Sequence, residues 1–154
     1  MPTRRTVLSS FLGALVMPAV ALGRPATQRV TLRGRVLPLR DVAKLFDLDV
    51  EADALPHWLV LATDDGRYLA IVKDTGGRTF YRDPRLQQRP VQVEGYCLPG
   101  GGIVQIVRVL TVKGNQLYEV YYWCDVCAIK RYFLEKVCEC CGGPMELREV
   151  PVKD

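Results

Sequence analysis

Four cysteines in two close pairs constrain this chain more than any other feature of its sequence. They are Cys124, Cys127, Cys138 and Cys141, in the pattern C-x2-C-x10-C-x2-C. Two residues between thiolates let one tight turn bring both sulfurs to about 2.3 Å from a single tetrahedral ion. The ten residues between the pairs are enough for a strand and its return. We therefore predict one closed metal site with four sulfur ligands.

Zinc is the ion that the sequence favours for this site, and iron is the alternative. Four thiolates in tetrahedral geometry suit either metal. A one-iron carrier of the rubredoxin type would usually have glycine after both cysteine pairs and a longer gap between them, whereas Ala128 follows Cys127 here. Because cysteine fills all four positions, the ion has no open position for water. We predict a structural ion with no hydrolytic role.

A disulfide framework is the other interpretation of these cysteines, since an exported protein usually meets an oxidising environment. The chain has six cysteines, with Cys97 and Cys140 outside the two pairs. Adjacent Cys140 and Cys141 are poorly placed to be bridged locally, and the paired spacing is that of a metal site. We therefore prefer metal binding, with Cys140 as a fifth thiol that could replace Cys138 or Cys141 as a ligand.

The segment from Tyr121 to Leu147 resembles a zinc ribbon. The second knuckle of this family is commonly C-x2-C-G-x-x-Met/Leu, and the stretch from Cys138 to Met145 matches that form. Gly142 follows the second cysteine directly, where such a turn needs a left-handed backbone. The first knuckle departs from the family pattern, because Ala128 stands where glycine is commoner. The resemblance implies a zinc-ribbon domain over residues 117–150, and a segment of this size folds because the metal holds it.

Upstream of the cysteines, the sequence predicts a small β-rich domain with the order β-β-β-α-β-β. Apolar and polar residues alternate in some segments and β-branched residues dominate others, and both patterns are typical of strands. The turn-rich tetrapeptide Asp64–Arg67 indicates a hairpin between the second and third strands. Asp83 and Pro84 are typical of the N-cap and first position of a helix. The predicted strands cover residues 30–36, 58–62, 68–72, 91–96 and 103–112, and the predicted helices cover residues 41–46 and 83–89.

This element order resembles the five-stranded OB barrel, in which a helix between the third and fourth strands closes one end. The resemblance covers residues 29–113 and rests on topology and turn placement, so a different small barrel or an open meander is the alternative. The predicted fold class is therefore mainly β. It consists of a small five-stranded OB-like barrel and a C-terminal zinc ribbon, a β-hairpin with two cysteine knuckles.

The first residues are typical of an export signal. Two arginines precede an uncharged apolar run from Val7 to Leu22, and small residues allow cleavage after Ala21. The stretch from Thr3 to Leu8 resembles the twin-arginine signal. That pathway carries folded proteins that are already loaded with metal. We predict a signal peptide over residues 1–21, no membrane span after its cleavage, and a periplasmic or cell-envelope location; an uncleaved anchor is the alternative.

Composition and charge argue against several functions. The 154 residues include 21 basic and 17 acidic side chains and carry a formal net charge of +4. This is far from the dense basic surface of a nucleic-acid-binding protein. The length suits one ordinary domain or two very small ones, which leaves no room for a large multidomain enzyme. The single histidine, His57, has no evident catalytic partners.

The whole arrangement resembles small exported bacterial proteins, and that resemblance implies no particular activity. We predict a non-enzymatic binding or assembly module of the cell envelope, whose partner is a protein or a polyanion. A one-iron electron carrier is the second hypothesis. The third, a nucleic-acid-binding pair of OB barrel and zinc ribbon, requires that the N-terminal segment is not a signal.

Overall fold

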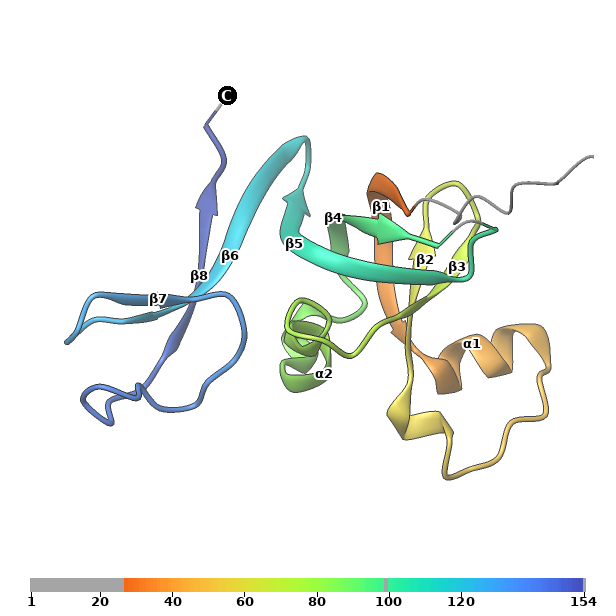
Figure 1. The fold of residues 1–154 in the computed structure, drawn as a ribbon, viewed down its shortest axis with the longest axis horizontal. Coiled ribbons are helices and arrows are strands. Elements are labelled where there is room, and N and C mark those ends of the chain that lie inside the picture. The colour runs from red at the N-terminus through yellow and green to blue at the C-terminus, as the bar shows by residue number, and fades with distance from the viewer. Residues whose placement is uncertain (1–26, 99, 154) are drawn as a thin grey trace, which may run out of the picture.

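Eight strands form the framework of the structure, a computed structural model that describes residues 27–98 and 100–153 (Figure 1). The predicted signal peptide, residues 1–21, lies outside the described residues. The strands are β1 (Gln28–Pro38), β2 (Leu59–Thr63), β3 (Tyr68–Ile71), β4 (Pro90–Cys97), β5 (Ile103–Lys113), β6 (Gln116–Cys124), β7 (Ile129–Arg131) and β8 (Glu146–Pro151). Between them lie the helices α1 (Leu39–Phe46) and α2 (Arg78–Arg82) and the 3-10 turns η1 (Leu55–His57) and η2 (Pro84–Leu86). The predicted fold class, mainly β, is confirmed.

The first five strands pair in a cycle that returns to its starting strand. β1 pairs with β2 and with β4, β2 pairs with β3, and β4 pairs with β5, all antiparallel. The last link is parallel and short, because β3 and β5 pair only through Ala70 with Ile103 and Ile71 with Val104. All five predicted strands are present in the expected order, and the hairpin predicted at Asp64–Arg67 joins β2 to β3.

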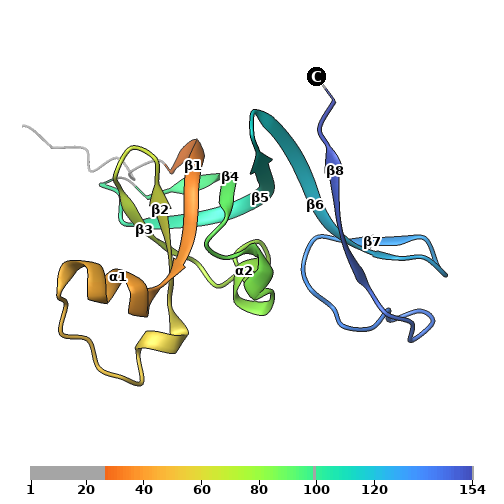
Figure 2. The same ribbon diagram turned by 180° about the vertical axis from the view of Figure 1, so that it is seen from behind.

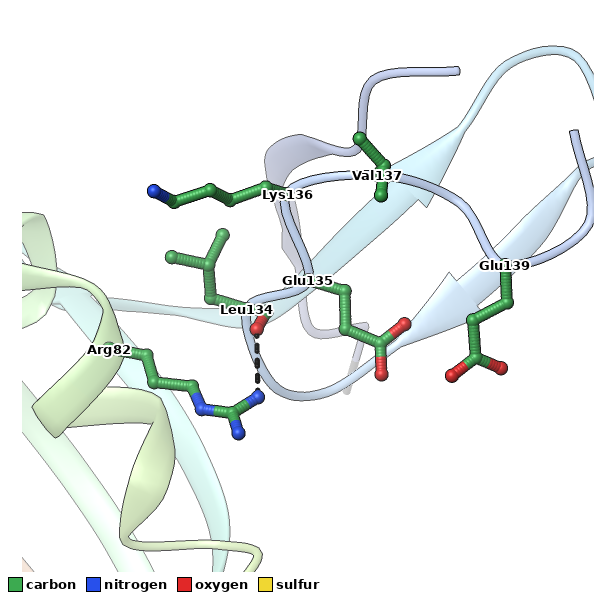
Figure 3. Close-up of a pocket in the computed structure, with 6 residues that line it drawn as sticks. All are labelled: Arg82, Leu134, Glu135, Lys136, Val137 and Glu139. Carbon is green, nitrogen blue, oxygen red and sulfur yellow. Dashed lines mark hydrogen bonds between the residues drawn. The ribbon is translucent and has the colours of Figure 1, made fainter. Parts of the chain in front are cut away.

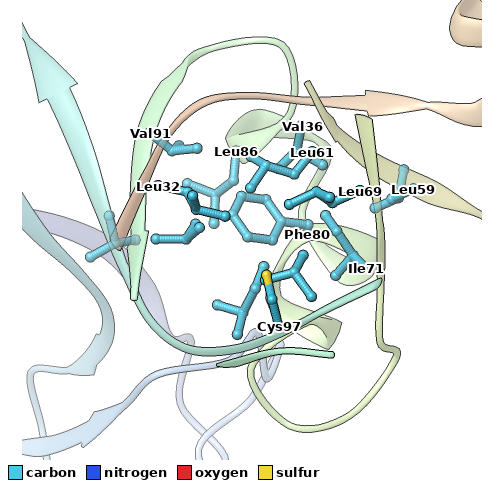
Figure 4. Close-up of a cluster of buried hydrophobic side chains, with 14 residues drawn as sticks. Leu32, Val36, Leu59, Leu61, Leu69, Ile71, Phe80, Leu86, Val91 and Cys97 are labelled. Carbon is cyan, nitrogen blue, oxygen red and sulfur yellow. The ribbon is translucent and has the colours of Figure 1, made fainter. Parts of the chain in front are cut away.

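The side chains that point into this cycle form the main hydrophobic core (Figure 4). Leu32 and Val36 of β1 are buried while the arginines between them are exposed, as expected of a strand with one buried face. Phe80 of α2 is completely buried, and Figure 4 shows its ring among aliphatic side chains of the strands. Full burial of a side chain of this size contributes about 1.5–3 kcal/mol. Helix α2 therefore supplies a central part of the core.

The helix predicted over residues 83–89 is wrong in extent. Asp83 does act as an N-cap, because its carboxylate accepts a hydrogen bond from the backbone N–H of Arg85 at 3.1 Å, but only the turn η2 follows. Gln88 has φ of 59°, a left-handed conformation that ends any helix, and Pro90 starts β4. The helix that packs into the core is α2, which precedes Asp83 and was not predicted.

The helix predicted over residues 41–46 is present as α1, but its start differs. Pro38 occupies the N-cap position and makes no side-chain cap hydrogen bond. Asp41 lies in the first turn of the helix and does not cap it. An acidic side chain there still interacts favourably with the positive end of the helix dipole.

The last three strands continue the sheet. β6 pairs with β5 next to the turn at Gly114, and further along the same edge it pairs with β7. β8 pairs with the other edge of β6, from Tyr118 opposite Pro151 to Trp123 opposite Glu146 (Figure 2). The break predicted at residues 113–115 is thus a tight turn within a continuous sheet. Separate domains over residues 29–113 and 117–150 remain a prediction.

A buried hydrogen bond joins the two parts of the sheet through Tyr122. This side chain is completely buried, and its hydroxyl donates to Asp83 Oδ2 at 2.6 Å. The Arg85 guanidinium donates to both oxygens of Asp83, at 2.8 and 2.7 Å. Although burial disfavours the charged form, the hydrogen bonds from Arg85 and Tyr122 hold the pKa of Asp83 below its ordinary value. The Asp83 carboxylate, between α2 and η2, is therefore charged, and both of its oxygens accept hydrogen bonds.

Helix α2 makes two further contacts with the segment after β7. Both ribbon views place it on the side of the first five strands that faces the C-terminal strands. Thr79 Oγ1 donates to the carbonyl of Tyr132 at 2.9 Å. Arg82 Nη1 donates to the carbonyl of Leu134 at 3.3 Å, beside a hollow of about 530 Å³ (Figure 3). The helix is thus fixed to the strands on one side and to the C-terminal segment on the other.

Glu149 of β8 forms a second polar junction. It makes ion pairs with Arg89, at 2.5 Å, and with Lys113, and it accepts a hydrogen bond from Thr111 at 3.0 Å. Although burial works against its charge, the contacts with Lys113, Thr111 and Arg89 keep the pKa of Glu149 below its ordinary value. These contacts hold β8 against the end of β5.

Replacing Tyr122 with phenylalanine tests the buried hydrogen bond between Tyr122 and Asp83. Tyr122→Phe keeps the ring but leaves Asp83 without one of its buried hydrogen bonds, so the free energy of unfolding should fall by about 1–3 kcal/mol. Tyr121→Phe is the matched control, because Tyr121 is partly exposed on the opposite face of β6, and it should change stability by less than about 0.5 kcal/mol. Urea unfolding with excess zinc measures both; equal effects would contradict the role given to this hydrogen bond.

Candidate metal centre

The structure brings together the sulfur atoms of the four paired cysteines. The Sγ atoms of Cys124, Cys127, Cys138 and Cys141 all lie within 4.8 Å of one another. Those of Cys124 and Cys141 are 3.5 Å apart. Four sulfurs placed about 2.3 Å from one central zinc form a tetrahedron with edges of about 3.8 Å. The arrangement therefore fits a four-coordinate ion with only small shifts of the side chains.

The alternative disulfide framework is absent from the described residues, which include all six cysteines, because each of them is a free thiol. Cys97 is buried in β4, as part of the main core. Cys140 is exposed and does not belong to the group of four converging sulfurs. Cys97 thus belongs to a different cluster of side chains, whereas the Cys140 thiol stands outside the group of four but within hydrogen-bond reach of Cys127.

The first cysteine turn is formed where β6 ends and β7 begins. Cys124 is the last residue of β6 and pairs with Ile129, the first residue of β7. The chain must therefore reverse between these two residues, which brings Cys127 back toward Cys124. Ala128 completes the reversal with φ of 53°. Strand pairing thus fixes the first pair of sulfurs.

The second cysteine turn precedes β8 and is closed by backbone hydrogen bonds. The N–H of Cys138 donates to the carbonyl of Gly143 at 2.7 Å, and the N–H of Gly142 donates to the carbonyl of Cys138 at 2.8 Å. The N–H of Gly143 also points at the sulfur of Cys141, at 3.4 Å. Gly142 has φ of 69°, so the predicted left-handed position is confirmed.

Backbone N–H groups and neighbouring sulfurs shift the pKa values of these thiols in opposite directions. The N–H groups of Cys141 and Cys140 lower the pKa of Cys138 to about 7. Hydrogen bonds from the Cys127 thiol to the sulfurs of Cys140 and Cys141 favour its neutral form and raise the pKa of Cys127, and burial and the repulsion of a negative sulfur act in the same direction. Four thiolates in so small a space repel one another, and a divalent cation at their centre would remove that repulsion.

A small hydrophobic cluster lies behind the sulfurs. It contains Tyr122, Cys124, Cys138 and Met145, with Leu134 and Leu147 packed at its edge. Within the described residues this cluster is far smaller than the core of the five-stranded cycle. So few buried apolar side chains contribute little to the free energy of folding. This segment therefore needs another source of stability.

The aromatic residues before the first cysteine divide between two faces, which the sequence did not indicate. Tyr122 lies behind the sulfurs, whereas Tyr121 and Trp123 lie on the opposite face, as expected for alternating positions of a strand. The Lys130 ammonium group is 4.4 Å from the Tyr121 ring centre, and the Arg148 guanidinium is 5.4 Å from that of Trp123. Of these three aromatic residues, Tyr122 alone forms part of the hydrophobic cluster behind the sulfurs.

Comparisons with models of protein families, with curated proteins and with solved structures find nothing that matches this chain. Among the helices in the described part of the chain, none combines the length and the apolar character needed to cross a membrane.

The residue after each cysteine pair provides a test of local strain. Ala128 and Gly142 hold equivalent left-handed positions, which cost a non-glycine residue about 1–2 kcal/mol. Ala128→Gly should therefore raise the free energy of unfolding by about 0.5–1 kcal/mol, and Gly142→Ala should lower it by about 1 kcal/mol. Urea unfolding of the zinc-loaded variants measures both changes. Loss of stability in Ala128→Gly would show that Ala128 is not strained.

Proposed function

We propose that Cys124, Cys127, Cys138 and Cys141 bind one zinc ion as thiolates and that this ion is structural. The observation that carries the proposal is the convergence of their sulfurs, all within 4.8 Å of one another. When bound, the ion links the β6–β7 turn to the turn before β8 without a covalent bond between cysteines. Sulfur atoms would fill all four coordination positions of the ion, so none is left for water or substrate.

The size of the segment supports a structural role for the metal. Residues 117–150 enclose only the small cluster around Tyr122, and so short a chain cannot bury enough apolar surface to fold by itself. Zinc binding to thiolates contributes about 10–16 kcal/mol in isolated finger peptides. That amount exceeds the total stability of many small domains, so the ion would determine whether this segment is folded.

The OB-like barrel and the zinc ribbon are part of the same proposal. The pairing order β1-β2-β3-β5-β4 with return to β1, and a helix between the third and fourth strands, is the arrangement expected of an OB barrel. Two cysteine turns carried by a three-stranded sheet of β7, β6 and β8 resemble a zinc ribbon. Together these features support a barrel followed by a metal-stabilised module.

We propose that the protein is a non-enzymatic binding or assembly module, exported to the periplasm or cell envelope. His57, the single histidine, is exposed on η1, an environment unlike that of a catalytic base. Three arginines of β1, Arg29, Arg33 and Arg35, share its exposed face and make no ion pair within the described residues. Such a row of cations fits the protein or polyanionic partner that the sequence predicts.

Metal analysis of cysteine variants tests the site. The wild-type protein from its native compartment should be colourless and contain one zinc ion per chain. Cys138→Ser should lose the metal and unfold the C-terminal segment, whereas Cys140→Ser should keep both, because the Cys140 sulfur lies outside the converging group. Elemental analysis and native mass spectrometry give the stoichiometry. A red protein that loses its visible absorption on reduction would indicate iron, and metal loss in Cys140→Ser would make Cys140 a ligand.

Fractionation of cells tests export. Replacing both Arg4 and Arg5 with lysine should leave the precursor in the cytoplasm, because the twin-arginine pathway requires the arginine pair, while a single Arg24→Lys change should not affect export. Immunoblots of cytoplasmic and periplasmic fractions give the result. If the wild-type chain stays uncleaved in the cytoplasm, export would be contradicted and the nucleic-acid-binding hypothesis would be supported.

A further inference from the structure

An apolar groove lies where β3 meets β5, well away in the sequence from the four paired cysteines. It consists of two adjoining cavities of about 450 and 260 Å³ that share Val72 and Ile103. The larger one is also lined by Trp58 and Tyr81, and the smaller one by Leu98. The combined space falls within the range of small-molecule binding sites.

Large apolar side chains in this groove are exposed to solvent. Trp58 and Leu98 are each 49% exposed, and Ile103 is 41% exposed. Single exposed apolar residues are ordinary, but several that line one continuous hollow are a feature of binding surfaces. A ligand that covered these side chains would bury their exposed apolar surface, which favours binding.

One cation stands at the rim of the groove. The Lys73 ammonium group lies 4.8 Å from the centre of the Tyr81 ring. That ring is held in place, because the Tyr81 hydroxyl accepts a hydrogen bond from the N–H of Leu59 at 3.1 Å and donates to the carbonyl of Ile71 at 3.3 Å. The lysine charge is therefore placed at a defined position beside apolar surface.

No carboxylate among the described residues lines either cavity, and within those residues Lys73 forms no ion pair. The acid next in sequence, Asp74, faces other groups. Its Oδ1 accepts from the N–H of Gly77 at 3.1 Å and its Oδ2 from Gln105 Nε2 at 2.8 Å. The groove is thus mainly apolar, with Lys73 as its charged group and His57, Thr27 and Gln105 as further polar residues of its lining.

We propose that this groove binds a small molecule with an apolar chain and one carboxylate, such as a fatty acid. The carboxylate pairs with Lys73, and the chain lies on Trp58, Val72 and Ile103 across the seam between β3 and β5. Complementarity of charge selects the anion, and the continuous apolar floor selects the chain. None of the four paired cysteines lines this site, so the proposal does not depend on which metal they bind.

Titration with dodecanoate, below the concentration at which it forms micelles, tests the site by isothermal calorimetry on the intact zinc-loaded protein. Wild-type protein should bind one molecule per chain. Lys73→Met should weaken dodecanoate binding by about tenfold or more, the effect of losing a charged hydrogen bond, and leave the binding of dodecanol, which has no charge, nearly unchanged. Trp58→Ala should weaken both ligands.

Lys153→Met is the matched control, because Lys153 is an exposed lysine that lines neither cavity. It should bind dodecanoate as the wild type does. Unchanged dodecanoate affinity in Lys73→Met, equal losses in Lys73→Met and Lys153→Met, or no binding by the wild type would each overturn the proposal. Circular dichroism of every variant shows that a loss of affinity is not a loss of folding.

Discussion

Charge repulsion between sulfurs is the constraint on which the C-terminal part of this protein depends. Four thiolates within 4.8 Å of one another repel strongly without a cation among them, and backbone N–H groups that lower the pKa of Cys138 to about 7 favour its thiolate form. The apolar cluster behind the sulfurs is too small to compensate for this repulsion. The strands β6, β7 and β8 therefore gain their order from the proposed metal and from contacts with the first five strands and α2.

Those contacts explain why α2 matters beyond its own short length. Phe80 fills the core of the first five strands, Thr79 and Arg82 donate to the chain after β7, and Asp83 at the end of the helix accepts a hydrogen bond from the Tyr122 hydroxyl. Tyr122 stands two residues before Cys124. The cysteine cluster and the main core are thus connected through α2 and the buried Tyr122.

Local patterns in the sequence predicted the strands, the hairpin at Asp64–Arg67 and the grouping of the cysteines, because alternation, turn residues and ligand spacing each act over a few residues. Contacts between distant segments could not be predicted in this way. The helix α2 has no N-cap signal and forms because Phe80 enters the core. Likewise, only the pairing of β6 with β8 shows that Tyr122 faces inward and Trp123 outward.

The position of β6 has a consequence for how the chain can be divided. β6 covers the edge of β5 from Leu110 to Lys113, a segment rich in β-branched residues. A fragment that ended at the turn beyond β5 would leave this edge unpaired, and exposed apolar edges join to one another between molecules. Truncated forms of this protein should therefore self-associate, so proteolytic release of the C-terminal strands would produce oligomers of the first five strands in place of a stable monomer.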